Sequence, residues 1–382
     1  MKGSLKLNFS WLALCGCCLF LSSCTATEPP PIAEIAEDAP TWQWVGLSTP
    51  VSGSLVSTNR NVVFAASDES VKPVFKTAPV YYPSLQRLQD GYIVPDRDRI
   101  VFLDGSLQEK TSQRIPGLGF PTMATATGAS NGEAAAWTFN VGNESQPYRR
   151  LIVSIVGESI NTSVRDNVPS SVRSCDDGSV VWFEQNDSVG RTLTVARMGA
   201  EGEVVENAVP LLQKGVVSEP FTALGCGDEK SYIAVANEQE GIDIFRLGNE
   251  EPPRSLDYVG SMSGLPSPGI NRSTQVTEGK VRQFSQQGTI STVDLSQQSI
   301  VESGPLLPEG QRPVSATIEG DSINVATQPI DGSPQFTVHS FSLERPTASG
   351  GGFALDGISE LAGESGIGAP YVIPVSIYRV TG

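Results

Sequence analysis

The chain has 382 residues and carries 42 acidic against 26 basic side chains, which gives a net charge of −16 at pH 7. A field of that sign repels nucleic acid and anionic lipid headgroups, so we expect neither as a partner of the folded part. The length also exceeds what one ordinary hydrophobic core takes, which makes internal repeats the first feature to seek.

The amino terminus has the features of a secretory signal. Lys2 and Lys6 precede a 13-residue apolar run from Phe9 to Leu21. A helix that spans a membrane needs about 20 apolar residues, so this run is too short to remain as a membrane helix. We therefore predict that residues 1–23 are an export signal.

The apolar run ends in Leu21-Ser22-Ser23-Cys24, which resembles the lipobox of bacterial lipoproteins. The resemblance implies cleavage before Cys24 and acyl chains such as palmitate on this cysteine, which would anchor the protein to the cell membrane on its outer or periplasmic side. Cleavage there would remove two lysines and no acid, and the net charge would become −18. The alternatives are an ordinary signal peptide in which the cysteine occurs by chance, and a buried core helix.

Residues 24–40 have the composition of a tether. After Cys24 this stretch holds four prolines and four acids and no aromatic or basic side chain. It cannot bury enough apolar surface to offset its ordering entropy, and proline-rich chains behave as extended spacers. We therefore expect one folded domain over residues 41–382.

A loose repeat runs through this domain. Each unit has a turn with acidic residues and glycine, a strand-like run, a polar turn and a second strand-like run. The turn glycines lie 41, 46, 49, 52 and 41 residues apart, at Gly91, Gly132, Gly178, Gly227, Gly279 and Gly320. Steps of this size are typical of propeller blades with four strands.

Short segments of small and β-branched residues precede most of these turns. They are expected as inner strands where blades crowd the central axis, and they lie at 122–130, 169–175, 220–226, 271–276 and 312–318. The layout resembles that of bacterial β-propellers. We therefore predict an all-β fold with about seven four-stranded blades, with a pair of β-sandwiches or a β-helix as the alternatives.

The two ends of the domain contain its most strand-like terminal pieces, residues 41–47 and 371–380. An open array of blades would leave exposed strand edges. We therefore expect one terminal piece to complete the blade that the other begins.

Cys175 and Cys226 are the two cysteines that remain beyond Cys24, and they lie at equivalent places in neighbouring units. An even pair in an exported chain predicts a disulfide. Free thiols are the alternative. A metal site is disfavoured because His339, the single histidine, supplies too few further ligands, and we expect neither a metal nor a cofactor.

Two patterns raise the question of catalysis. Residues 128–132 match the G-x-S-x-G motif around Ser130, and His339 lies downstream. A nucleophile elbow needs a strand followed by a helix, whereas this motif lies in a predicted turn between strands. We therefore assign no catalytic residue.

Paired carboxylates could still act on a glycan, and the candidates at one rim of neighbouring units are Asp176, Asp177, Asp228 and Glu229. In an acidic chain some carboxylates adjoin by chance. Asp96 and Asp98 alternate with Arg97 and Arg99, which favours a solvated hairpin over a calcium loop. Most of the tryptophans are expected in blade packing rather than in a sugar-binding platform; they are Trp42, Trp44, Trp137 and Trp182.

These observations predict an extracytoplasmic, lipid-anchored binding or scaffold module with a protein partner in the cell envelope. That function follows only from analogy with the fold. The alternatives are an enzyme that acts on an envelope glycan or polymer through the rim acids, and a protein that captures small ligands or cations.

Overall fold

The computed structural model describes residues 42–51, 60–68, 70–78, 84–118, 124–128, 132–141, 149–185, 192–211, 216–248, 253–267, 269–347, 351–362 and 371–380. The predicted signal, the tether with Cys24, and Ser130 lie outside the described residues. No helix in the part of the chain that the structure describes is long and apolar enough to cross a bilayer.

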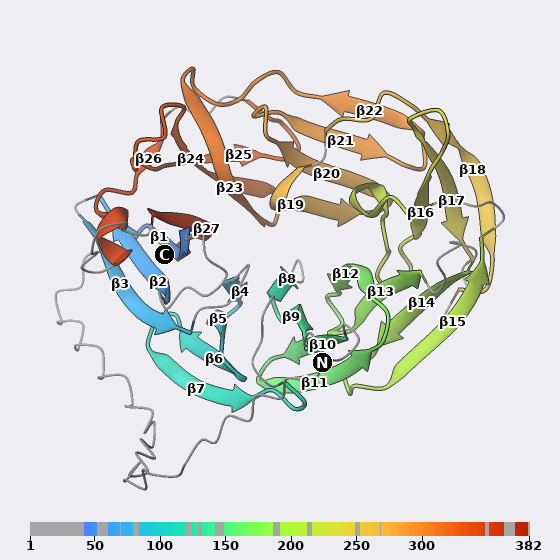
Figure 1. Ribbon diagram of the computed structural model, residues 1–382, viewed down its shortest axis with the longest axis horizontal. Coiled ribbons are helices and arrows are strands. Elements are labelled where there is room, and N and C mark those ends of the chain that lie inside the picture. The colour runs from blue at the N-terminus through green and yellow to red at the C-terminus, as the bar shows by residue number, and fades with distance from the viewer. Residues whose placement is uncertain are drawn as a thin grey trace, which may run out of the picture. The chain divides into compact units, whose positions relative to one another are not determined.

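The described strands form seven small antiparallel sheets arranged in a ring (Figure 1). We number these blades in chain order. Blade 1 contains β27 (Tyr371–Arg379), β1 (Trp44–Val51), β2 (Asn61–Ser67) and β3 (Ser70–Thr77). Blade 2 contains β4 (Gln86–Leu88), β5 (Gly91–Asp96), β6 (Arg99–Asp104) and β7 (Glu109–Arg114). Blade 3 contains β8 (Ala124–Gly128), β9 (Ala134–Asn140), β10 (Arg150–Val156) and β11 (Ser159–Arg165).

The remaining blades follow the same plan. Blade 4 contains β12 (Pro169–Ser174), β13 (Val180–Gln185), β14 (Thr192–Met198) and β15 (Val204–Pro210), and blade 5 contains β16 (Tyr232–Ala236), β17 (Ile242–Leu247) and β18 (Leu256–Met262). Blade 6 contains β19 (Gly269–Thr277), β20 (Lys280–Ser285), β21 (Ile290–Asp294) and β22 (Ser299–Glu302). Blade 7 contains β23 (Gln311–Glu319), β24 (Ser322–Pro329), β25 (Thr337–Ser342) and β26 (Phe353–Ala354). Two 3₁₀ turns, η1 (Glu219–Phe221) and η2 (Ile358–Ala362), accompany them.

This arrangement is a seven-bladed β-propeller, which confirms the predicted fold. The expected ring closure is also confirmed, because β27 at the carboxyl end pairs with β1 at the amino end. The register places Trp44 opposite Arg379 and Val51 opposite Tyr371. The first and last strands of the domain therefore share one sheet, and blade 1 closes the ring.

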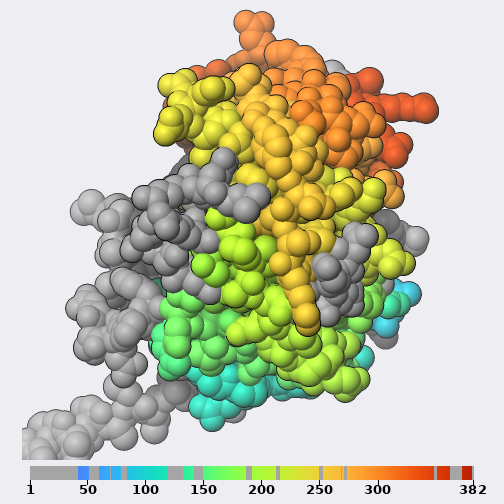
Figure 2. Space-filling model, turned by 90° about the vertical axis from the view of Figure 1, so that its right-hand side faces the viewer, coloured from blue at the N-terminus to red at the C-terminus, as the bar shows by residue number. Residues whose placement is uncertain are grey.

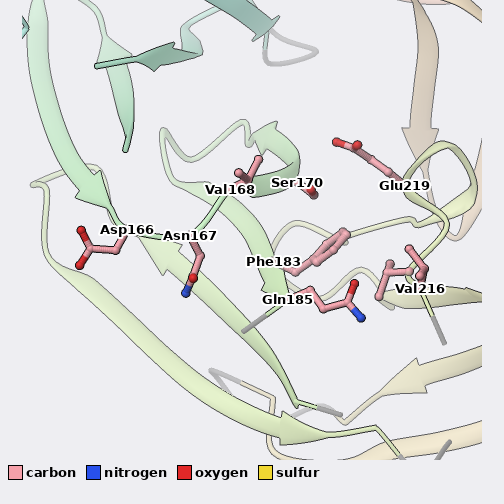
Figure 3. Close-up of a pocket in the computed structure, with 9 residues that line it drawn as sticks. Asp166, Asn167, Val168, Ser170, Phe183, Gln185, Val216 and Glu219 are labelled. Carbon is pink, nitrogen blue, oxygen red and sulfur yellow. The ribbon is translucent and has the colours of Figure 1, made fainter. Parts of the chain in front are cut away.

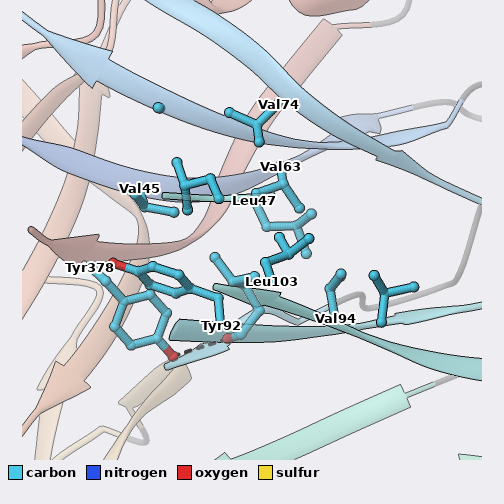
Figure 4. Packing of buried hydrophobic residues seen from close by; sticks show 12 residues of the cluster. Val45, Leu47, Val63, Val74, Tyr92, Val94, Leu103 and Tyr378 are labelled. Atoms are coloured by element: carbon cyan, nitrogen blue, oxygen red, sulfur yellow. Dashed lines mark hydrogen bonds between the residues drawn. The ribbon is translucent and has the colours of Figure 1, made fainter. Parts of the chain in front are cut away.

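The hydrophobic core is distributed between blades rather than gathered at one centre. Each of the seven buried clusters joins residues from two neighbouring blades. Between blades 1 and 2, for example, Leu47 and Val63 pack with Leu103, and Tyr92 lies beside Tyr378 (Figure 4). Burial falls toward the outside of each blade: β2 is buried along its length, whereas the outer strand β7 has no buried residue. Trp44, Trp137 and Trp182 are buried in such clusters, as predicted.

Several of the glycine turns bring a blade close to the preceding one. Gly178 has a φ of +80°, and a Cβ at this position would come within 2.8 Å of Val156 in blade 3. Gly279 has a φ of +76°, and a Cβ at this position would come within 2.5 Å of the Tyr232 ring in blade 5. Gly178 and Gly279 thus serve both the turn and the close contact between blades.

One predicted strand is wrong. Residues 220–226 were expected to form the inner strand of the fifth unit, but they contain the end of η1 and one isolated bridge between Ala223 and Tyr232. Pro220 lies in the first turn of η1, where the fixed φ of proline suits the turn, and Phe221 is buried in the core of blades 5 and 6. Blade 5 therefore has three regular strands in the part of the chain that the structure describes.

Candidate functional site

A cleft of about 490 Å³ opens between blades 4 and 5, at the end of the blades where their inner segments begin. Its walls come from the connection into β12, from the end of β13, and from the segment that leads into η1 (Figure 3). The lining residues are Asp166, Asn167, Val168, Ser170, Phe183, Gln185, Val216, Val217 and Glu219. Figure 2 shows blades 4 and 5 from outside, in green to yellow, and cluster residues of both pack together.

The inner strand of blade 4 is irregular beside this cleft. The pairing of β12 with β13 shifts register between Ser170 and Arg173, which marks a β-bulge. Within the bulge Ser171 has a φ of +49°, in the left-handed region that residues with a Cβ seldom adopt. This conformation directs its amide N–H to Glu219 Oε1, at 3.1 Å across the boundary between the blades. The bulge therefore fixes one oxygen of a carboxylate that lines the cleft.

The segment of blade 5 that faces this bulge replaces a regular inner strand. Val217 bridges Val235, and the Ser218 amide donates to the Ala234 carbonyl at 2.7 Å, before the chain turns into η1 at Glu219. Phe221 is buried in the core of blades 5 and 6. Glu219 is consequently exposed at the cleft while the residues around it are held by the sheet and the core.

Every second residue from Ser171 to Cys175, in β12 and directly after it, contacts blade 5. Ser171 contacts Glu219, the Arg173 guanidinium donates to the Leu224 carbonyl at 2.7 Å and pairs with Glu229 at 2.6 Å, and Cys175 forms a disulfide with Cys226. The predicted disulfide is therefore confirmed, with the two Cα atoms 5.5 Å apart. The disulfide joins the carboxyl end of the segment 216–226, away from the cleft, to blade 4.

A buried ion pair supports the opposite wall of the cleft. Arg165, directly before the lining residue Asp166, pairs with Glu184 at 2.5 Å and with Glu206 at 2.6 Å. Glu184 is 2% exposed and also accepts a hydrogen bond from Trp182 Nε1 at 2.9 Å. Burial alone would lower the pKa of Arg165, but its hydrogen bonds to the two glutamates raise it. The pair fixes the chain on both sides of the blade 3 to blade 4 boundary.

The four predicted rim acids lie at the other end of β12, in the turns of blades 4 and 5. Asp177 accepts hydrogen bonds from the amide and hydroxyl of Ser179 and pairs with Arg197 at 2.5 Å. Burial alone would raise the pKa of Asp177, but Ser179 and Arg197 lower it. Glu229 pairs with Arg173 and accepts the Cys226 amide, while Asp176 and Asp228 lie in the same turns. Two of these acids thus stabilise turns and the contact between blades.

The structure does not bring the other candidate residues together into a site. His339 is buried in the middle of β25 in blade 7. After the 128–132 motif the described chain forms strand β9 from Ala134, whereas a nucleophile elbow continues into a helix. The predicted hairpin is confirmed, since β5 and β6 meet at Asp96 and Arg99, which pair at 3.0 Å; Asp96 is buried, however, and accepts the Ala78 amide. Within the described ranges, no three His, Cys, Asp or Glu residues are grouped as metal ligands.

The residues that line the cleft were not predicted from the sequence. Val168, Val216 and Glu219 belong to connections whose composition resembles that of any other loop. Pro220 at the start of the predicted strand was no distinguishing signal, because the segment 169–175 also begins with a proline and forms β12.

No family model matches this chain, and no curated protein is significantly similar to it. Solved structures with a similar arrangement include the periplasmic gluconolactonase PpgL of Pseudomonas aeruginosa, at 14% identity and a TM-score of 0.49 over 88% of this chain and 99% of that one. The apocarotenoid oxygenase of Synechocystis is 7% identical, with a TM-score of 0.47 over 88% of this chain and 92% of that one. AztD of Citrobacter koseri is 10% identical, with a TM-score of 0.42 over 89% of this chain and 99% of that one. At these identities and TM-scores, none of the structural similarities assigns an activity to this chain.

Proposed function

We propose that the protein is a lipid-anchored binding module of the cell envelope, and that its partner docks in the cleft between blades 4 and 5. The observation that carries the proposal is the coincidence of this cleft with the break in the blade plan. A bulge with a left-handed serine and a 3₁₀ turn meet there, and departures from a regular fold of this kind cluster at functional sites.

The surface of the cleft supports binding. Val168 is 53% exposed and Val216 is 69% exposed, and both line the same cleft as Glu219. Exposed apolar side chains rimmed by polar groups are typical of interaction sites. The lipobox at Leu21–Cys24 and the acidic, proline-rich residues 25–40 support an anchored, extracytoplasmic location.

The alternative, an enzyme that acts on an envelope glycan through the rim acids, is less well supported. Asp177 and Glu229 each pair with an arginine at a distance of 2.5 to 2.6 Å. A carboxylate that is to donate a proton needs a raised pKa, whereas the surroundings of Asp177 lower it.

The experiment is photo-cross-linking in the native host, with p-benzoyl-L-phenylalanine at Val216. The matched control carries the same cross-linker at Val301, which is 67% exposed on the outer strand β22 of blade 6. We expect a discrete adduct from Val216 that is absent from Val301, and mass spectrometry identifies the partner. Equal labelling at the two positions, or none at Val216, contradicts the proposal.

The anchor is tested in the same cells by fractionation. We expect the wild-type chain in the membrane fraction, and labelling with an alkyne fatty acid on Cys24. Replacement of Cys24→Ala should abolish the label and release the protein from the membrane. A protein that stays in the membrane without label would exclude the lipid anchor.

A further inference from the structure

The carboxylate of Glu219 is held in a defined orientation. One of its oxygens, Oε1, accepts the Ser171 amide at 3.1 Å, and the Ser171 hydroxyl lies 3.4 Å from the Glu219 carbonyl oxygen. The left-handed backbone at Ser171 costs conformational energy, and the contact to Glu219 compensates for part of that cost. In Figure 3 the carboxylate points from blade 5 toward Ser170 of blade 4, into the cleft. Its second oxygen, Oε2, can accept a further donor.

Glu219 differs from the neighbouring acids in its ion pairing. Glu184 pairs with Arg165, Glu229 pairs with Arg173, and Asp166 pairs with Arg149. Within the described part of the chain no lysine or arginine forms an ion pair with Glu219, and no cationic side chain is among the residues that line the cleft. The charge of Glu219 can therefore be met by a cation from outside the chain.

The same cleft offers apolar surface next to this charge. Val168 comes from the connection into blade 4 and Val216 from the segment that leads into η1, and both are more than half exposed. Phe183 and Val217 are buried beneath them. A ligand that covers the valines and reaches Glu219 must combine an aliphatic stem with a cationic end, which is the chemistry of a lysine or arginine side chain.

We propose that the cleft accepts the lysine or arginine side chain of a polypeptide partner, with the charged group at Glu219 and the aliphatic stem between Val168 and Val216. This inference rests on the proposed function, since it names the ligand of the same cleft. A free diamine fits less well, because Asp166, the second acid of the cleft, is already paired with Arg149. A divalent metal ion fits less well, because it requires several acidic ligands.

The charge of the whole protein favours a basic partner as well. The net charge of −16 attracts cationic chains over long distances and raises the rate at which they meet this surface. The ion pair in the cleft then supplies specificity for the charged group, because a charge-assisted hydrogen bond is about twice as strong as a neutral one.

The test uses the full-length chain in detergent and two blocked pentapeptides, acetyl-Gly-Ala-Lys-Ala-Gly-amide and the same peptide with Nε-acetyl-lysine. Acetylation keeps the stem and removes the charge. We expect the acetylated peptide to bind at least about tenfold more weakly, the loss typical of a hydrogen bond to a charged group. Glu219→Gln should cause a similar loss for the lysine peptide and no change for the acetylated one.

Glu309→Gln is the matched control, because it removes the same charge from an exposed position between blades 6 and 7. It should leave both affinities unchanged. Val168→Ser should weaken both peptides alike, because it removes part of the wall for the stem. Equal affinity of the two peptides for the wild-type protein, or equal losses in Glu219→Gln and Glu309→Gln, would overturn the inference. Cadaverine binding as tightly as the lysine peptide would overturn the assignment to a polypeptide.

The photo-cross-link separates this inference from the proposed function. With the cross-linker at Val216, an adduct that persists at full yield in the Glu219→Gln background shows that the cleft binds a partner without the ion pair, which overturns the inference alone. An adduct that is lost at least about tenfold in that background supports it. No adduct in either background overturns the proposed function itself.

Discussion

His339 shows how closely single residues are fitted in this fold. Its side chain is 4% exposed in β25 and stacks on Phe341, with the ring centroids 6.3 Å apart. Gly352 lies against it: a Cβ at that position would come 2.7 Å from the imidazole Cε1, so any larger residue would displace the ring. Burial lowers the pKa of His339. The histidine is thus a packing residue that is neutral in the folded state at neutral pH.

We predict that this histidine makes the protein less stable in mild acid. The unfolded chain binds the proton near the ordinary pKa of 6.5, while the folded chain binds it only at lower pH. Protonation therefore favours the unfolded state as the pH falls below about 6.5, by up to about 1.4 kcal/mol per pH unit. Urea unfolding at pH 7.5 and 5.5 should show this loss in the wild type and a smaller loss in His339→Gln.

The carboxylates provide an internal control for that measurement. Asp177 has a lowered pKa, so the stability that it contributes is present above its ordinary value of 3.8 and is lost at lower pH. The wild type and His339→Gln should therefore lose the stability contributed by Asp177 to the same extent below pH 4. If the free energy of unfolding falls equally in the wild type and in His339→Gln between pH 7.5 and 5.5, His339 is not the source of the loss.

At the scale of elements, the inner segment of blade 5 is joined to blade 4 mainly at the end away from the cleft. Arg173 binds the Leu224 carbonyl, and the disulfide joins Cys226 to blade 4. Near the cleft Ser171 contacts Glu219 across the blade boundary, while within blade 5 the segment is paired at Val217 and through the Ser218 amide. Arg173 and the disulfide therefore help to set the position of Glu219 relative to blade 4.

Removal of the disulfide should loosen this segment more than the rest of the ring. Cys175 and Cys226 are separated by 51 residues, and a cross-link over that distance contributes about 2–4 kcal/mol. The double variant Cys175→Ala/Cys226→Ala should lose stability of that order in urea unfolding. Hydrogen exchange should rise first in residues 217–229.

The blade 6 to blade 7 boundary serves as the comparison for hydrogen exchange, because it has a Gln275 to Gly320 hydrogen bond but no disulfide. A uniform rise around the ring would mean that the disulfide stabilises the propeller as a whole and has no local effect on the cleft.

The elements differ in how far the sequence could predict them. Inner strands such as β12 and β23 were predicted because small and β-branched residues precede a glycine turn. The same composition at 220–226 was misleading: Thr222 and Ala223 suit a strand, but the chain turns through η1 over Glu219–Phe221 and buries Phe221 in the core. The disulfide could be predicted from the equivalence of two units. The cleft could not, because the left-handed Ser171 and the exposed valines depend on how two blades meet.

At the scale of the whole molecule, ring closure joins the ends of the domain. β27 pairs with β1 along eight residue pairs, and its residues Val372, Ile377 and Tyr378 are buried. The Ile377 amide also donates to Thr317 of blade 7 at 3.0 Å, and the Tyr378 hydroxyl donates to the Leu85 carbonyl of blade 2 at 2.9 Å. One strand therefore connects blades 7, 1 and 2.

A chain that stops before Tyr371 should lose its cooperative unfolding transition. It exposes the edge of β1 and opens two blade boundaries, so we expect a broad thermal transition and a tendency to aggregate. A chain that stops after Val380 keeps all of β27 and should unfold as the full-length protein does. Calorimetry of the two truncated proteins checks this. A sharp transition in the shorter chain would show that the ring holds without its closing strand.

Ring closure also gives the molecule an orientation. The chain enters β1 at Trp44, opposite Arg379, where the inner strand β27 ends; the cleft lies at the other end of the inner strands, beside Ser170 near the start of β12. The chain therefore enters the ring on one face, and the cleft opens on the opposite face. Anything attached to the chain just ahead of Trp44 is thus joined to the face that does not carry the cleft.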